Sequence, residues 1–442
     1  MVRLFLVVYF VGILSLPFSV HAAEDIQWWH AMGGKLGEKV NSLADGFNAS
    51  QDGFRVVPVY KGNYAETMTA GIAAFRSKRP PHILQVFEVG TATMMAARRA
   101  IRPIGEVMAA AGEAFDADEY IASISGYYTG SDGEMLSLPF NSSTPVLYYN
   151  KNAFKKAGLD PNKPPKTWQQ VVDYSKKLLA AGYECGFSTA WISWIHLENL
   201  AAWHNTPFGT KENGFGGLDS RLLLNGELLV KHLTKLAVWE KEKIFSYGGR
   251  RNLGNSKFIT ATCPMYTESS AGYAGFKAAA DFDFGISELP YWSDVVESPQ
   301  NTIIGGASLW VMAGHKESEY RGVAQFLKYL SSPAIQADWH QSTGYLPITK
   351  AAYELTKQSG YYQKHPDMEV ALRQMTSSAP TSNSKGLRFG HMARLRDIIL
   401  NEIEAVISGR KSAKDGLDSI VRSGNKLLAS FEKISGARKS KK

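Results

Sequence analysis

The chain has 442 residues, with 44% hydrophobic, 12% aromatic and 20% charged side chains, a composition that excludes an intrinsically disordered protein. Its two cysteines exclude a disulfide-dense scaffold and a zinc site built from four cysteines. The formal charge is +8, but Arg3 and the five basic residues of the segment 433–442 supply six of these charges, which leaves +2 on the rest of the chain. A nearly neutral body does not favour nucleic-acid binding.

The first 22 residues have the pattern of a secretory signal. Arg3 precedes a largely apolar run of 13 residues, 4–16, and small residues precede the predicted cleavage site at the end of the segment. A bilayer takes roughly 20 residues to cross, so this run is too short for a membrane span. We expect an exported, soluble protein with the segment removed; an uncleaved anchor is the alternative. In an oxidising compartment Cys185 and Cys263 can form a disulfide or remain two buried thiols, and both options stay open.

Strand and helix patterns alternate through the first hundred residues. Apolar side chains three and four positions apart, such as Leu43 and Phe47, predict helices, while alternating β-branched runs such as FRVVPVY predict strands. The predicted order is a strand at 26–29, a helix at 35–47, a strand at 54–60, a helix at 65–75, a strand at 83–89 and a helix at 91–99. Short connections between alternating elements imply βαβ units and a parallel sheet buried on both faces.

The rest of the chain continues with a strand at 146–149, a proline-rich turn at 160–165 and a helix that Thr167 caps. The final third is predicted to be helical, and Ser412 and Asp415 have the spacing of a capping box before the last helix. The sequence contains no evident repeat or low-complexity linker. We therefore expect two lobes that share the chain rather than consecutive domains.

Motifs of known enzyme classes are missing from the sequence. There is no HExxH, CxxC or GxSxG, and the Gly-Lys pair at 34–35 is not followed by the Ser or Thr that a P-loop needs for Mg²⁺. His30 has no carboxylate partner visible in the sequence, so it is interpreted as a structural or ligand-contacting histidine. A phosphodiesterase or glycosidase would need a metal cluster or a paired acid and base. We predict no enzyme, no cofactor and no metal.

Small residues, hydroxyls and aromatic rings gather in loops that follow predicted strands. Backbone N–H groups at small residues, together with hydroxyl donors, can bind an anion without a metal, although each loop by itself also fits an ordinary turn. These loops are 60–64, 141–144, 269–272, 304–308 and 344–345. Arg396 lies near the start of a predicted helix at 394–408, where the guanidinium and the helix dipole can both attract an oxyanion.

With these residues in view, the chain resembles the family 1 extracellular solute-binding proteins, and within them the periplasmic branch that binds sn-glycerol 3-phosphate for an ABC importer. The matching runs include YKGNYAETMTAGIAAFR from Tyr60, FNSSTPVLYYNKNAFKKAGLDPNKPPKTW from Phe140, WHQSTGYLPITKAAY from Trp339 and GLRFGHMARLR from Gly386. They spread over nearly the whole chain after the signal segment, so the resemblance covers the full length.

The resemblance implies an α/β two-lobed periplasmic-binding-protein fold of type II, like that of maltose-binding protein, with a hinge between the lobes. The first lobe would comprise 23–143 and 297–347, and the second 144–296 and 348–432, followed by a basic tail at 433–442. The protein is expected to be a periplasmic monomer.

The resemblance also implies a set of ligand residues. It consists of Tyr64, Glu88, Ser143, Trp168, Ser269, Gly306, Tyr345 and Arg396. Arg396 would pair with the phosphate bidentately, helped by the hydroxyls and the Gly306 amide. Glu88 would accept hydrogen bonds from the glycerol hydroxyls beside Tyr64, and Trp168 would form an apolar wall.

The function implied is delivery of sn-glycerol 3-phosphate, and of glycerophosphodiesters such as glycerophosphocholine, to inner-membrane permease subunits that a cytoplasmic ATPase drives. A binder of sugars or other polyol esters is the alternative. The sequence departs from the family pattern at 191–215 and at Glu268, just before Ser269. Glu268 beside a phosphate site would be unfavourable if it pointed inward, so the preference between glycerol phosphate and larger esters such as glycerophosphocholine stays open.

Overall fold

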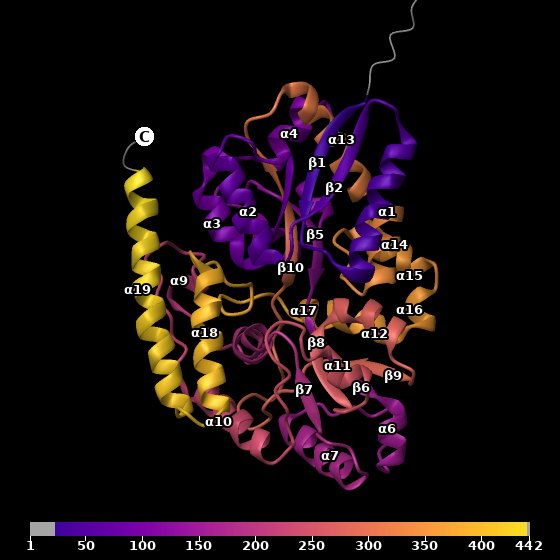
Figure 1. Cartoon of the computed structure of the whole chain (residues 1–442), viewed down its shortest axis with the longest axis vertical. Helices are drawn as coiled ribbons and strands as arrows, with labels where there is room; N and C mark the ends of the chain where they lie inside the picture. Colours follow the sequence, from indigo (N-terminus) through magenta and orange to yellow (C-terminus); the bar gives the residue numbers. More distant parts are fainter. Residues whose placement is uncertain (1–22, 440–442) are drawn as a thin grey trace, which may run out of the picture.

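The computed structural model describes residues 23–439, so the predicted signal segment lies outside the described residues. Figure 1 shows two lobes, one above the other, each built on its own β-sheet with helices around it. The α/β two-lobed fold that the sequence predicts is confirmed. No helix among the described residues is long and apolar enough to cross a membrane.

The sheet of the first lobe is mixed rather than parallel. Its strands, in spatial order, are β2 (Phe54–Tyr60), β1 (Glu24–His30), β3 (Ile83–Phe87), β10 (Gly305–Met312) and β4 (Ile101–Arg102), and β5 (Leu138–Ser143) also pairs with β10. Strands β1, β2 and β3 run parallel, as predicted, but β10 is antiparallel to β3, β4 and β5. The prediction of a parallel sheet was wrong here because β10 enters from the second lobe rather than through a βαβ crossover.

The first three helices of the first lobe form where the apolar spacing predicted them, although the third ends at Ala96 rather than at residue 99. Helix α1 buries Val40, Leu43 and Phe47 on one face. Helix α2 begins with a capping box, in which the Asn63 side chain accepts the Glu66 amide at 3.2 Å and Glu66 accepts the Asn63 amide at 2.8 Å. The helices are α1 (Gly34–Ser50), α2 (Tyr64–Arg76), α3 (Thr91–Ala96), α4 (Ile104–Ala110), α5 (Ala122–Tyr128), α13 (Glu317–Ser331), α14 (Pro333–Thr343), α15 (Lys350–Gln358) and α16 (Tyr361–Lys364).

The second lobe is built on a four-stranded sheet. Its spatial order is β7 (Phe187–Thr189), β8 (Met265–Ser269), β6 (Pro145–Asn150) and β9 (Phe284–Ser287). The surrounding helices are α6 (Lys151–Lys156), α7 (Trp168–Ala180), the π-helix η4 (Trp194–Asn199), α8 (Leu200–Trp203), α9 (Thr210–Asn213), α10 (Glu227–Lys241), α11 (Asn255–Ile259), α12 (Tyr273–Ala279), α18 (Met392–Ile407) and α19 (Ala413–Lys439). Thr167 caps α7, as predicted. Cys185 and Cys263 form a disulfide, which settles the question that the sequence left open.

The two lobes are joined at a hinge where three segments of the chain cross. The first crossing is made by β5, which continues through Thr144 into β6. The second is the segment before β10, which runs in the other direction, and the third is α17 (Val370–Thr376). The Thr144 hydroxyl donates to the Ala371 carbonyl at 2.9 Å, and the Gln374 amide donates to that hydroxyl at 3.0 Å. The Thr302 amide donates to the Gln374 carbonyl at 3.2 Å. These hydrogen bonds hold the three crossing segments together.

The predicted boundaries of the lobes stay a prediction, but two packing details bear on them. Helix α15, on the second-lobe side of the boundary predicted at 347, packs against α14, and Thr349 bridges to Tyr120 of the first lobe. Helix α19 runs to Lys439, so the predicted basic tail at 433–442 begins inside a helix.

Candidate ligand-binding cleft

A cleft between the lobes holds about 320 Å³ of space. Seven of the eight predicted ligand residues line it: Tyr64, Glu88, Ser143, Ser269, Gly306, Tyr345 and Arg396. Most of them lie where an element begins or ends. Tyr64 starts α2, Glu88 follows β3, and Ser143 ends β5 at the hinge. Backbone topology therefore brings together residues that are up to 332 positions apart in the sequence, and their roles as ligand contacts stay a prediction.

Trp168 does not reach the cleft, contrary to the prediction. Only 2% of its surface is exposed, and its ring packs against Phe187, His232 and Trp239 inside the second lobe. The cause is its position as the first residue of α7, on the helix face that covers the sheet of this lobe. The tryptophans that do line the cleft are Trp191 and Trp194.

Arg396 is clamped by two carboxylates. Its Nε donates to Oε1 of Glu198 at 2.8 Å and its Nη2 to Oε2 at 2.7 Å, and the same Nη2 lies 2.6 Å from Oε1 of Glu88. Glu198 therefore occupies the edge of the guanidinium, formed by Nε and Nη2, that can bind an anion bidentately and that was predicted to bind the phosphate. Among the described residues Nη1 donates no hydrogen bond, so its two N–H groups remain for a ligand.

Burial and neighbouring charges have opposite effects on the pKa values of Glu88 and Arg396. Burial raises the pKa of Glu88, and the adjacent Arg396 partly offsets that rise. The two carboxylates together raise the pKa of the Arg396 guanidinium, against the effect of its own burial. Arg396 therefore stays charged, and the cluster of one cation and two carboxyl groups carries no surplus of positive charge for a phosphate.

Glu198 is the main residue of the cleft region that sequence reasoning missed. It lies in the π-helix η4, a form that is frequent at functional sites. In the same π-helix, Nδ1 of His196 lies 2.9 Å from Nε2 of His232, and Nε2 of His196 lies 3.1 Å from the hydroxyl oxygen of Thr189. These contacts anchor the helix to the lobe. A signal was present in the sequence: Glu198 is the only acid in the apolar stretch 191–203, and such an acid is rarely buried without a cation.

Glu268 also lines the cleft, next to Ser269. Its Oε1 accepts the Ser269 amide at 2.6 Å, and the Asn255 amide, oriented with its nitrogen toward Glu268, donates to Oε2 at 2.8 Å. Burial nevertheless raises the pKa of Glu268 to about 8. The side chain is therefore mostly protonated at neutral pH, which removes most of the repulsion that an ionised Glu268 would exert on a phosphate.

Comparison with known proteins identifies the family. Residues 42–370 match the family model described as bacterial extracellular solute-binding protein. The chain belongs to the bacterial extracellular solute-binding proteins. It is 51% identical over 425 residues to the sn-glycerol-3-phosphate-binding periplasmic protein UgpB of Salmonella paratyphi A, covering 96% of this chain and 97% of the relative. The UgpB protein of Escherichia coli O1:K1 is 50% identical over 421 residues, with 95% and 96% covered.

Solved structures place the fold of this solute-binding protein among those of sugar and phosphodiester binders. UgpB from Mycobacterium tuberculosis in complex with glycerophosphocholine superposes with a TM-score of 0.76 at 21% identity, covering 93% of this chain and 99% of that one. Maltose-bound MalE3 of T. maritima gives a TM-score of 0.73 at 16% identity, with 92% and 100% covered. At these identities the likeness shows the fold alone, and it confirms the type predicted from the sequence.

Replacing Glu268 with glutamine should change how the stability of this solute-binding protein depends on pH. The folded protein holds the Glu268 proton up to about pH 8, whereas the unfolded chain releases it near the ordinary pKa of 4.5. The contribution of Glu268 to stability is thus complete below pH 4.5 and is lost as the pH rises to about 8. Urea unfolding of both proteins from pH 5 to 9 should show the variant gaining stability relative to the wild type as the pH rises. A difference that is the same at every pH would mean that Glu268 is not protonated in the fold.

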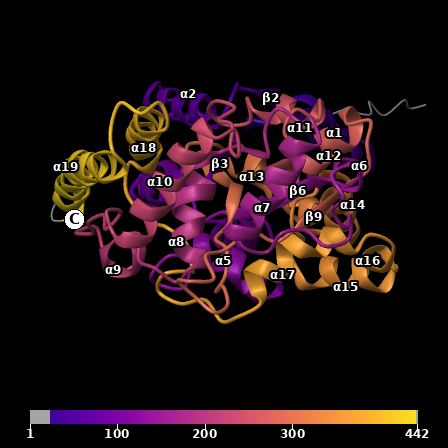
Figure 2. The ribbon, with the colours of Figure 1, turned by 90° about the horizontal axis from the view of Figure 1, so that it is seen from below.

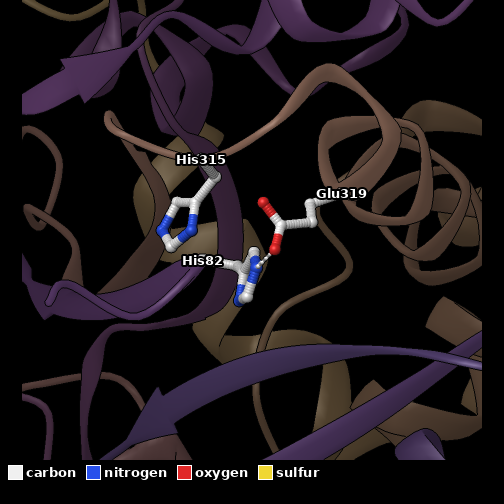
Figure 3. Close-up of side chains that lie close together, drawn as sticks. All are labelled: His82, His315 and Glu319. Carbon is white, nitrogen blue, oxygen red and sulfur yellow. Dashed lines mark ion pairs between the residues drawn. The ribbon is translucent and has the colours of Figure 1, made fainter.

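His82, His315 and Glu319 form a second cluster of titratable groups (Figure 3), and none of the three lines the cleft. His82 precedes β3, at the end of the strand opposite to Glu88. Its Nδ1 accepts the Gln27 amide at 3.0 Å, so Nε2 carries the proton in the neutral ring and faces Oε1 of Glu319 at 3.7 Å. Burial lowers the pKa of His82 to about 4, so the ring is neutral at pH 7. The ring of His82 stacks on that of His315 with the ring centres 3.9 Å apart. In this arrangement Nε2 of His82 carries a proton, so it has no free lone pair with which to bind a metal.

Proposed function

We propose that this protein binds sn-glycerol 3-phosphate in the cleft between its lobes and delivers it to the permease subunits of an ABC importer, and that it also accepts glycerophosphodiesters such as glycerophosphocholine. The observation that carries the proposal is the identity of 50–51% over nearly the whole chain to proteins named for this ligand. The gathering of seven predicted ligand residues around one cleft supports it.

The phosphate would lie against donors from both lobes. Nη1 of Arg396 supplies a charged pair of N–H groups, and the hydroxyls of Ser143 and Ser269 lie in the same lining. Gly306 has a φ of +92°, and a Cβ there would collide with the carbonyl oxygen of Asn141. Only glycine fits this position, and its bare backbone lets a phosphate oxygen approach the amide closely.

The glycerol end would lie between Glu88 and Tyr64. The Tyr64 ring stacks on Phe87 with the ring centres 5.5 Å apart, and its hydroxyl oxygen accepts a hydrogen bond from Asn141 at 2.8 Å. The tyrosine, which lines the cleft, is therefore held in place. The Glu88 carboxylate can accept from the two glycerol hydroxyls. Trp191 and Trp194 flank the rest of the cleft, where the head group of a phosphodiester would lie.

The same geometry supports binding without catalysis. Glu88 and Glu198 both pair with Arg396, so they are held as ion-pair partners and do not form a free acid and base. We further propose that residues 1–22 direct export to the periplasm and are removed, and that the mature protein acts as a monomer. The names of the relatives, which include the word periplasmic, support this location.

Isothermal titration calorimetry of the mature chain, residues 23–442, tests the proposal. The titrants are sn-glycerol 3-phosphate, glycerophosphocholine and maltose. We expect saturable binding of the two glycerol esters at a 1:1 ratio and no heat from maltose. Saturable maltose binding with no response to either ester would overturn the assignment and favour a sugar binder with the same fold.

Replacing Glu88 with glutamine should separate recognition of the glycerol from recognition of the phosphate. Glutamine keeps the size of the side chain but loses the charge that strengthens hydrogen bonds from the glycerol hydroxyls. We expect sn-glycerol 3-phosphate to bind about tenfold more weakly, while inorganic phosphate binds with little change. Calorimetry with both ligands measures the difference, and an equal loss for both would show that Glu88 does not contact the glycerol.

A further inference from the structure

Glu268 brings a buried acid into the wall of the cleft, beside Ser269. It lies one position before the end of β8, and only 2% of its surface is exposed. Asn255, the first residue of α11, donates to its carboxyl group, and a Cβ on Gly272, just before α12, would lie 2.8 Å from its Cγ. Figure 2 shows α12 beside α1 of the first lobe, which it contacts, so elements of both lobes meet at this wall.

No cation compensates this acid. Within residues 23–439, Glu268 forms no ion pair. The basic residues of the adjacent helices are held elsewhere: Lys257 of α11 donates to a serine hydroxyl at 3.0 Å, and Lys277 of α12 lies over a tyrosine ring. The two cations in the lining of the cleft are already paired, Arg396 with its two carboxylates and Lys35 with an acid on the next turn of α1 at 2.9 Å. A negative charge that enters the cleft therefore acts on Glu268 without a free cation between them.

The other titratable groups around Glu268 stay neutral while it ionises. They are tyrosines: Tyr148 of β6, Tyr266 of β8 and Tyr345 of the first lobe, each of which interacts electrostatically with Glu268. Burial raises the pKa of all three, that of Tyr345 to about 12, so they keep their protons up to pH 9. Since the pKa of Glu268 is about 8, this carboxyl group is the one of the four that changes charge between pH 7 and 9.

The glycerol esters differ in the charge that they bring to this wall. The second pKa of a phosphate monoester is about 6, so sn-glycerol 3-phosphate is close to a dianion at pH 7. A phosphodiester has a single ionisable phosphate oxygen, and its choline group makes glycerophosphocholine neutral overall. An ionised Glu268 repels the dianion, whereas the protonated side chain does not. A bound monoester therefore favours the protonated form of Glu268, and a bound diester has much less effect on it.

We propose that Glu268 is a specificity-determining residue of the cleft, which makes the monoester bind together with a proton and makes the protein prefer the phosphodiester once the Glu268 carboxyl is ionised. The inference rests on the proposed function, because it concerns the same cleft and the same ligands. The proton passes from the buffer to the Glu268 carboxyl group. Affinity for the monoester is complete at pH values where the free protein already holds this proton, and it falls as the pH rises above about 8.

Calorimetry of the mature chain with both esters at pH 7 and pH 9 tests the selectivity. If the bound dianion raises the pKa of Glu268 by one unit or more, affinity for sn-glycerol 3-phosphate falls by about five- to tenfold between these pH values, whereas affinity for glycerophosphocholine changes by less than about twofold. Glu268→Gln removes the ionisation, so this variant should bind the monoester at pH 9 about five- to tenfold more tightly than the wild type does. Glu288→Gln, which changes an exposed acid of the same lobe paired with Arg373, should keep the wild-type pH profile.

Proton uptake provides a second measurement, which needs only the wild type if Glu268→Gln fails to fold. Titrations at pH 8.5 in buffers of different ionisation enthalpy give the number of protons taken up on binding. We expect about half a proton per sn-glycerol 3-phosphate in the wild type and close to none in Glu268→Gln. Binding of the monoester without proton uptake, or the same pH profile in the wild type and Glu268→Gln, would overturn the role of Glu268 while leaving the proposed function intact. Failure of both esters to bind at pH 7 would overturn the proposed function, and this inference with it.

Discussion

Arg396→Ala is expected to weaken binding of sn-glycerol 3-phosphate by about 2–5 kcal/mol, because a desolvated phosphate loses its charged partner. The loss has a second component. Without the guanidinium, Glu88 of the cleft lining and the buried Glu198 next to it lose the cation that compensates them. Calorimetry measures the loss, and Arg394→Ala, which changes an exposed arginine on the same helix, is the matched control. An affinity equal to that of the wild type would remove Arg396 from the site.

The same substitution should lower the stability of the fold. Glu198 is 1% exposed, and leaving such a carboxylate without its cation costs about 3–5 kcal/mol. The double variant Arg396→Ala with Glu198→Gln should recover part of this loss, because it removes the stranded charge as well. Urea unfolding separates the two variants. If the double variant is no more stable than the single one, the bidentate pair does not account for the loss.

Removing the disulfide with Cys185→Ala and Cys263→Ala should cost about 4 kcal/mol in the free energy of unfolding, because the bond closes a long loop in the unfolded chain. The two cysteines are 78 positions apart, and their Cα atoms lie 4.9 Å from each other. Urea unfolding of the variant, and of the wild type with and without reductant, measures the effect.

Binding should survive the loss of the disulfide, since neither cysteine lines the cleft. Calorimetry of the double-alanine variant with sn-glycerol 3-phosphate is therefore the internal control. A reduced wild type as stable as the oxidised one would contradict the predicted contribution of the bond. Loss of binding at a temperature where the variant remains folded would contradict its separation from the cleft.

Local patterns predicted the elements well because their causes are local. The alternation of FRVVPVY predicted β2 with its observed ends, and the spacing of Leu43 and Phe47 predicted the buried face of α1. Thr167 caps its helix through a hydroxyl three residues from the amide that it accepts. The direction of β10 was not predictable in this way, because a strand that arrives across a hinge has the same residue pattern as one that follows a helix.

The sequence by itself determined the family, the two-lobed fold and seven of the residues that line the cleft, because recognisable sequence motifs spread along the chain carry them. Only the tertiary structure decided what each side chain faces. Glu198 clamps Arg396 from 198 positions away, and Trp168 turns into the core of its lobe. The shift in the Glu268 pKa likewise arises from burial among distant segments. Burial and charge pairing depend on how lobes assemble, and no local spacing of residues encodes them.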